Sequence, residues 1–117
     1  MAWTTSKSAT VDGAGFCEFC YSSDLSGCEA VKAAVTGKSI YLTSLSIHCL
    51  AAITVTVGEG ETTGAVTTAY ATWEFTTGGS GVTLNFRRPV KLTAATALCA
   101  DASGAGNVTI VAQGYVK

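Results

Sequence analysis

Charged residues are scarce in this sequence, and their scarcity limits the partners that the protein can bind. Only 13% of the 117 residues are charged, the formal net charge is −1, and no block of like charges occurs. Domains that read nucleic acid need a basic stripe to neutralise phosphates. Here the only adjacent basic pair is Arg87-Arg88. We therefore expect no nucleic-acid partner.

Long apolar runs are also missing. Thr, Ser or Gly interrupts every apolar stretch within a few residues, whereas a membrane-spanning helix needs about 20 apolar residues in succession. We therefore expect no membrane span. The first eight residues show neither the basic segment nor the apolar segment of a secretory signal. We expect synthesis in a cytoplasm, and departure from it only as part of a larger particle.

A shortage of histidine argues against catalysis. His48 is the single histidine, and on a strand its side chain points away from the face that carries Ile47 and Cys49. If those two residues belong to the core, His48 lies on the outer surface. The sequence also lacks the Gly-x-Ser-x-Gly motif that marks the nucleophile turn of many hydrolases. We predict that the protein is not an enzyme and has no catalytic residue.

The cysteines do not form a recognisable metal site. Cys17 and Cys20 lack a second ligand pair at matching spacing, which structural zinc sites commonly have. An odd number of cysteines in a chain without a secretory signal also argues against a disulfide framework. We expect buried thiols and neither a metal nor a cofactor. The alternative is a disulfide formed in an oxidising medium by the front cysteines. The five cysteines are Cys17, Cys20, Cys28, Cys49 and Cys99.

Short segments of alternating apolar and polar residues dominate the chain. Residues 51–57 are the clearest example, and they end at the turn signal Gly58-Glu59-Gly60. Residues 82–86 and 107–112 repeat the pattern, and each follows a Gly-rich segment. Alternation with a period of two, bounded by turn residues, predicts β-strands.

One longer segment, residues 38–50, changes phase along its length. Its apolar residues occupy even positions up to Leu42 and odd positions from Leu45 onwards. Such a switch would send side chains to the wrong face of a sheet unless an extra residue is accommodated. We therefore expect a β-bulge or bend near Thr43-Ser44.

The remaining segments complete the predicted fold. Strands about ten residues apart, separated by turn signals, are typical of sandwiches and barrels. We predict an all-β protein, an antiparallel β-sandwich of jelly-roll type with about 7–9 strands. The further strands are expected at residues 15–21, 30–35, 70–75, 90–94 and 97–100.

Residues 1–8 show no alternation and predict a flexible N-terminal arm, which leaves residues 9–117 as a single β-sandwich domain. Trp3 lies in the arm, where it could anchor against a partner. The alternative is that Trp3 folds back onto its own domain.

Two charged features are candidate sites. Glu59 and Glu61 flank Gly60, where two carboxylates could hold a cation loosely. The favoured alternative is a charged turn that keeps a strand end from associating.

Arg87 and Arg88 precede Pro89, and two guanidinium groups there could clamp carboxylates of a neighbouring subunit. The alternative for them is a solubilising shoulder of a hairpin. Trp3, Arg87 and Arg88 are the candidate partner contacts.

Four phrases of the sequence resemble one family: residues 37–45, 53–60, 86–94 and 103–115. They are similar to small β-sandwich structural proteins of tailed bacteriophages, some of which are capsid decoration (cement) proteins. The resemblance implies a virion protein, made in the host cytoplasm, that stabilises a phage head. It implies binding to the major capsid protein or other virion subunits, and a homo-oligomer with a trimer favoured.

Two other functions are compatible with the sequence. One is a carbohydrate- or host-binding module associated with a tail or fibre, which would use loops such as residues 78–81 and carry exposed aromatic residues there. The other is a filament- or lattice-forming structural protein that assembles by strand addition.

Overall fold

The computed structural model describes residues 5–11, 15–22, 27–60, 66–76, 79–104 and 106–117, with the backbone alone at residues 5–11, 27–28 and 67. These residues form strands and connections, and no helix long and apolar enough to cross a membrane occurs among them.

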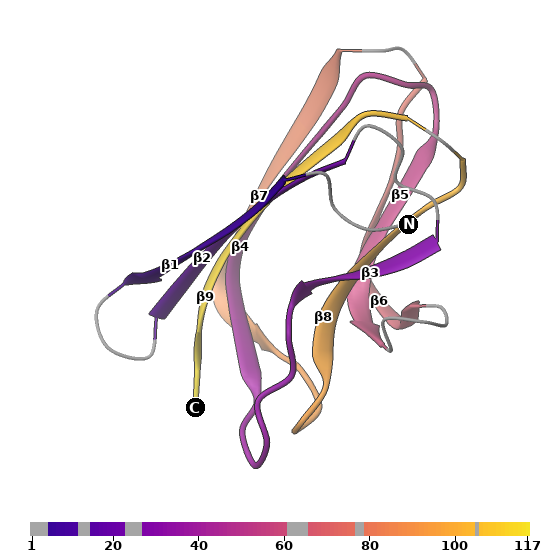
Figure 1. The fold of residues 1–117 in the computed structure, drawn as a ribbon. Coiled ribbons are helices and arrows are strands. Elements are labelled where there is room, and N and C mark those ends of the chain that lie inside the picture. The colour runs from indigo at the N-terminus through magenta and orange to yellow at the C-terminus, as the bar shows by residue number, and fades with distance from the viewer. Residues whose placement is uncertain (1–4, 12–14, 23–26, 61–65, 77–78, 105) are drawn as a thin grey trace.

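Nine strands run through this part of the chain and form two sheets that pack face to face (Figure 1). The five-stranded sheet has the order β1-β2-β9-β4-β7 and the four-stranded sheet the order β3-β8-β5-β6. All pairings are antiparallel. The strands are β1 (Thr5–Val11), β2 (Gly15–Ser22), β3 (Gly27–Lys32), β4 (Ile40–Cys49), β5 (Thr54–Gly60), β6 (Val66–Glu74), β7 (Ser80–Lys91), β8 (Ala97–Ala102) and β9 (Val108–Val116).

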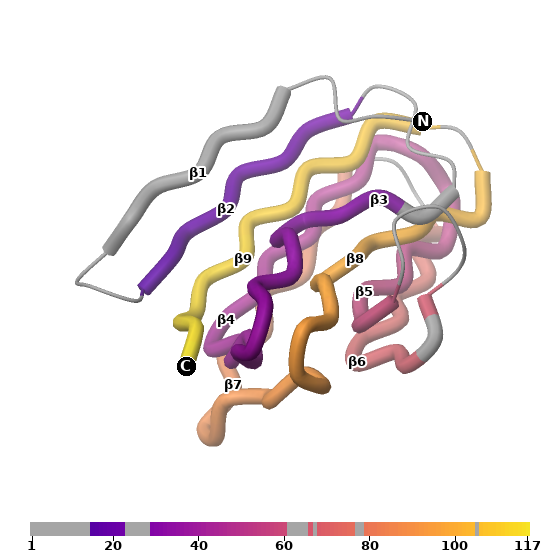
Figure 2. The backbone as a smooth tube through the Cα atoms, turned by 60° about the horizontal axis from the view of Figure 1, so that its bottom comes forward, coloured from indigo at the N-terminus to yellow at the C-terminus, as the bar shows by residue number. Residues whose placement is uncertain are grey.

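The strand order from β2 to β9 is that of a jelly roll, as the sequence predicts. The first of these eight strands pairs with the last, β2 with β9, and the pairs β3–β8, β4–β7 and β5–β6 follow inwards. Alternate pairs fall into alternate sheets, which produces the two Greek keys of this fold. β1 adds a fifth strand to the first sheet, beside β2 (Figure 1). Figure 2 shows β2 alongside β9 in the same sheet.

The core lies between the two sheets and follows from the alternation in the sequence. Leu45, Ile47 and Cys49 of β4 are fully buried, and they pair with Ala112, Ile110 and Val108 of β9. Val55 and Val57 of β5 face them from the other sheet. Burial of each large aliphatic side chain contributes about 1.5–3 kcal/mol. This core holds the two sheets together.

The phase change in β4 produces the predicted irregularity. The register of β4 with both neighbours shifts between Leu42 and Ser44, and Thr43 is the extra residue relative to β9, where Leu42 and Ser44 pair with the adjacent Gly114 and Gln113. The Thr43 hydroxyl donates a hydrogen bond to the carbonyl oxygen of Gln113, 3.0 Å away. The bulge keeps Leu42 and Leu45 in the same core although their positions differ in parity.

Four segments differ from the sequence expectations. Gly58-Glu59-Gly60 is the end of β5 and not a turn, since β5 continues to Gly60. Residues 82–86 and 90–94 are not separate strands, because β7 runs without a break from Ser80 to Lys91. Residues 5–8 of the expected N-terminal arm lie in β1, which pairs with β2 through backbone groups and so does not need an apolar alternation.

Candidate interaction surface

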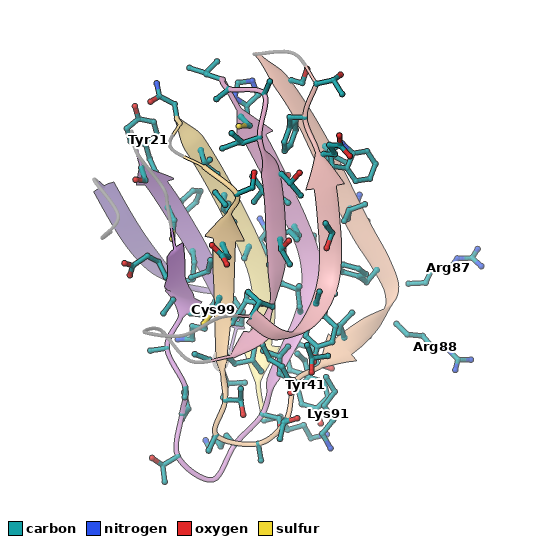
Figure 3. The ribbon with its side chains drawn as sticks, turned by 90° about the vertical axis from the view of Figure 1, so that its right-hand side faces the viewer. Tyr21, Tyr41, Arg87, Arg88, Lys91 and Cys99 are labelled. Carbon is teal, nitrogen blue, oxygen red and sulfur yellow. The ribbon has the colours of Figure 1, made fainter. Side chains whose placement is uncertain are left out.

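Arg87 and Arg88 lie on a bulge of an edge strand. β7 forms one edge of the five-stranded sheet, and the four residues Phe86–Pro89 stand opposite Thr43 alone in β4. Both arginines are exposed, and Figure 3 shows their side chains projecting away from the two sheets. Pro89 has no N–H to donate, which suits an irregular edge position. Both guanidinium groups can therefore reach carboxylates on another molecule.

Apolar side chains line the same edge. Val82 and Leu84 pair with the buried Ile47 and Leu45 of β4, so they lie on the inner side of β7, yet both are only half-buried. Phe86 is half-buried too. Across the opening, Trp73 pairs with the buried Val55 and is 43% exposed. Paired residues of antiparallel strands share one side of the sheet, so Trp73 lies on the inner side of β6.

These side chains mark the side of the sandwich where β6 and β7 are the edge strands. We call it the open lateral face, and its residues are Trp73, Val82, Leu84, Phe86, Arg87 and Arg88. A side chain of the size of Trp73 loses substantial hydrophobic stabilisation when it stays in water. A partly exposed apolar strip next to two arginines has the composition of the centre of a protein interface.

Glu59 of β5 is a carboxylate inside the sandwich that links segments near one end of this side. It is buried, and its carboxylate accepts hydrogen bonds from the Thr93 backbone N–H at 2.8 Å, the Thr93 hydroxyl at 2.6 Å and the Tyr70 hydroxyl. Burial raises the pKa of Glu59, but these hydrogen bonds outweigh it, so the pKa lies below its usual value. Burial and the adjacent carboxylate raise the pKa of Tyr70. Glu59 thus joins β5, β6 and the β7–β8 connection.

The position of Glu59 corrects the expectation of a charged, solvated turn. Its carboxylate oxygens accept hydrogen bonds from other residues of the protein, so Glu59 is a structural anchor. Glu61, the other half of the pair considered for a cation, lies outside the described residues. Trp3 lies outside them as well, so its role as a partner contact stays a prediction.

Four cysteines are buried, as expected: Cys17, Cys20, Cys49 and Cys99. The Cys20 thiol lies against the Val31 carbonyl at 4.0 Å and the Cys99 thiol donates to the Gly60 carbonyl at 3.4 Å. The described part of the chain contains no group of three or more His, Cys, Asp or Glu residues placed to hold a metal ion. The side chain of Cys28 is not among the described atoms.

The outer face of the five-stranded sheet carries polar and aromatic residues. His48 is exposed while Ile47 and Cys49 are buried, which confirms the predicted orientation. At one end, the rings of Tyr41 and Tyr115 stack with centroids 4.9 Å apart and planes 8° apart. The Lys91 ammonium lies 5.9 Å from the Tyr41 ring centroid, and Figure 3 shows the two side chains together.

Sequence reasoning identified the two arginines but missed the apolar residues beside them. The alternation over residues 82–86 indicates an inner face for Val82, Leu84 and Phe86, but only the strand order reveals that β7 is an edge. The comparisons give no further guide to the function of this surface: neither a protein-family model, nor a curated protein, nor a solved structure matches the chain.

Proposed function

We propose that this protein is a non-enzymatic structural protein of a bacteriophage particle, a capsid decoration subunit that stabilises the head through contacts between subunits. The observation that carries the proposal is the open lateral face, where Trp73 is 43% exposed and Arg87 and Arg88 project from a bulged edge. The family resemblance of the sequence supplies the virion context.

The low charge of the chain supports the same proposal. A surface rich in Thr, Ala and Gly with 13% charged residues gives little electrostatic repulsion between neighbouring copies. The jelly-roll fold occurs in viral capsid domains, but also in lectins and cupins, so the fold alone assigns no role. The proposed mechanism is mechanical: many subunits bridge neighbouring capsid proteins and raise the barrier to rupture of the shell.

The test uses capsids assembled from the major capsid protein of the same genome, without this chain. We expect the purified protein to co-sediment with expanded capsids and to raise the temperature at which they rupture, measured by differential scanning calorimetry. Arg87→Glu/Arg88→Glu is expected to weaken the binding. The matched control is Lys38→Glu/Lys117→Glu, which reverses two other exposed charges. Failure of the wild-type chain to bind capsids would contradict the proposal.

A further inference from the structure

β7 differs from the other edge strands in how well it is protected against pairing. β3 is short and its register shifts between Ala30 and Lys32, while the register of β6 with β5 shifts twice. Such irregularities prevent another strand from adding to an edge. β1 pairs regularly with β2 and includes Lys7, a residue type that natural edges use for the same purpose.

The first half of β7 carries none of these protections. Ser80 to Asn85 pair one-for-one with Cys49 to Ser44 of β4, and this stretch contains no charged residue and no proline. The bulge begins only at Phe86. This stretch is about 20 Å of extended edge strand, and among the described strands only β4 pairs with it. Its outer edge is therefore where another strand would add. The adjacent Val82 and Leu84 are half-buried and would be covered by it.

Charges of opposite sign stand at the two ends of this stretch. Glu74 is exposed and ends β6 at the end of the sandwich where β7 begins. The end of β6 and the beginning of β7 lie close together there. The Phe75 N–H donates a hydrogen bond to the Ile53 carbonyl oxygen and the Gly79 N–H donates one to the Cys49 carbonyl oxygen, on either side of the β4–β5 connection. Arg87 and Arg88 stand beyond the other end of the stretch. Glu74 and the two arginines therefore place opposite charges at the two ends of the side on which β6 and β7 are the edge strands.

From this arrangement we infer that the open lateral face binds a second copy of the same chain through antiparallel pairing of the two β7 strands over residues 80–85. A two-fold axis through the middle of the stretch brings Arg87 and Arg88 of each copy to the partner's Glu74, and these contacts occur twice. Isologous contacts of this kind need a surface that is complementary to itself, which opposite charges at opposite ends provide. The pairing also covers Trp73 and Leu84 of both copies.

This inference uses the same face as the proposed function but has its own readout, self-association of the purified chain in solution, so that either can fail without the other. It names a two-fold contact, whereas the resemblance favours a trimer. A trimer formed through another surface would not affect it, provided that the β7 contact is also found.

Sedimentation equilibrium over a wide concentration range tests the contact in three variants of the full chain. We expect wild type to form dimers, and Arg87→Glu/Arg88→Glu to dissociate at least about tenfold more readily, because like charges then face Glu74. Adding Glu74→Arg to that variant reverses both partners and is expected to restore dimers. Lys38→Glu/Lys117→Glu is the control and should associate like wild type. Circular dichroism verifies that each variant is folded.

Three results would overturn the inference. Wild type could remain monomeric at all concentrations, its self-association could be insensitive to reversal at Arg87 and Arg88, or the triple variant could fail to recover. A wild-type chain that stays monomeric while the reversal abolishes binding to capsids would assign this face to a different virion protein. Raised salt, which screens exposed charges, should weaken the wild-type dimer if the contact is correct.

Discussion

The two lateral sides of the sandwich differ in how completely they are closed. On one side β2 and β3 approach each other, and Phe16, Cys20 and Val31 are buried between them. Lys32 completes this side, with its ammonium 5.4 Å from the Phe16 ring centroid and 3.8 Å from Glu18. On the other side Trp73 and the inner residues of β7 remain partly in water.

The difference separates two roles of apolar side chains within one fold. On the closed side they stabilise the single chain, since their burial is complete without a partner. On the open side a large part of the available hydrophobic stabilisation is not realised in the single chain. Substitutions should therefore divide into those that change folding and those that change association.

The largest expected effect distinguishes two phenylalanines, one on each side. Phe16→Ala removes a buried ring and should cost about 3–5 kcal/mol of unfolding free energy. Phe86→Ala removes a half-buried ring and should cost less than half as much. Urea unfolding of both variants, measured at a concentration where the chain is monomeric, gives the two values. Equal losses would contradict the distinction between the two sides.

Glu59 is expected to matter next, because it anchors the open side through Thr93 and Tyr70. Glu59→Gln should destabilise the protein by about 1–3 kcal/mol at pH 7, since charge-assisted hydrogen bonds are lost. The pKa of Glu59 is lower in the folded protein than its usual value of 4.5. The stabilisation by the carboxylate is therefore fully present above pH 4.5 and disappears as the pH falls through the folded-state pKa.

Thermal unfolding of wild type and Glu59→Gln between pH 7 and pH 2.5 measures this dependence. The difference in stability between wild type and Glu59→Gln should be largest near neutral pH and should become smaller below pH 4.5. Tyr70→Phe is the partner variant, which removes one hydrogen-bond donor to Glu59 and keeps the ring. Its loss of stability should be smaller than that of Glu59→Gln and should decrease in the same pH range. A gap that is independent of pH would show that the charge of Glu59 is not what stabilises the anchor.

A smaller effect is expected from Lys32 on the closed side. Lys32→Met keeps most of the side-chain length over Phe16 but removes the ammonium near Glu18. The pair is separated by 3.8 Å and Lys32 is partly exposed, so the loss should be about 1 kcal/mol or less. Urea unfolding at low and high salt measures it, and a loss as large as that of Phe16→Ala would mean that the ion pair, rather than packing, closes this side.

The smallest effect on folding is expected from the two arginines. Arg87→Ser/Arg88→Ser should change the unfolding free energy by no more than about 0.5 kcal/mol, as is usual for exposed positions. The same variant should weaken the association of copies in sedimentation experiments. A large loss of stability in the monomer would mean that the two arginines stabilise the fold itself. It would weaken their assignment as contacts to another molecule.

The fold could be predicted to a large extent because alternation reports which residues face the core. The bulge at Thr43 was predictable for the same reason, since the parity of apolar residues changes between Leu42 and Leu45. β1 was not predictable, because an edge strand that pairs through its backbone needs no alternation. The trimer and the virion role rest on the resemblance of the sequence and stay predictions.

The misassigned turn at residues 58–60 has a physical explanation. Gly58 lies at a register shift between the paired strands β5 and β6, and a Cβ atom there would collide with the carbonyl oxygen of Thr68. The glycine serves close approach of two strands and not a change of direction, and sequence alone does not distinguish these uses. Likewise the open lateral face depends on which strands are edges, a property of strand order rather than of local pattern.

The most direct test of the open lateral face is hydrogen–deuterium exchange, measured by mass spectrometry on dilute and on concentrated wild-type protein. The outward side of β7 over residues 81–85 faces no strand of the sheet that the structure describes, so exchange of the amides on that side should slow when copies pair. We predict that protection in this segment rises with concentration, while the β3 segment, residues 27–32, is unchanged. Exchange at residues 80–85 that does not vary with concentration, in a sample shown to associate, would contradict the account.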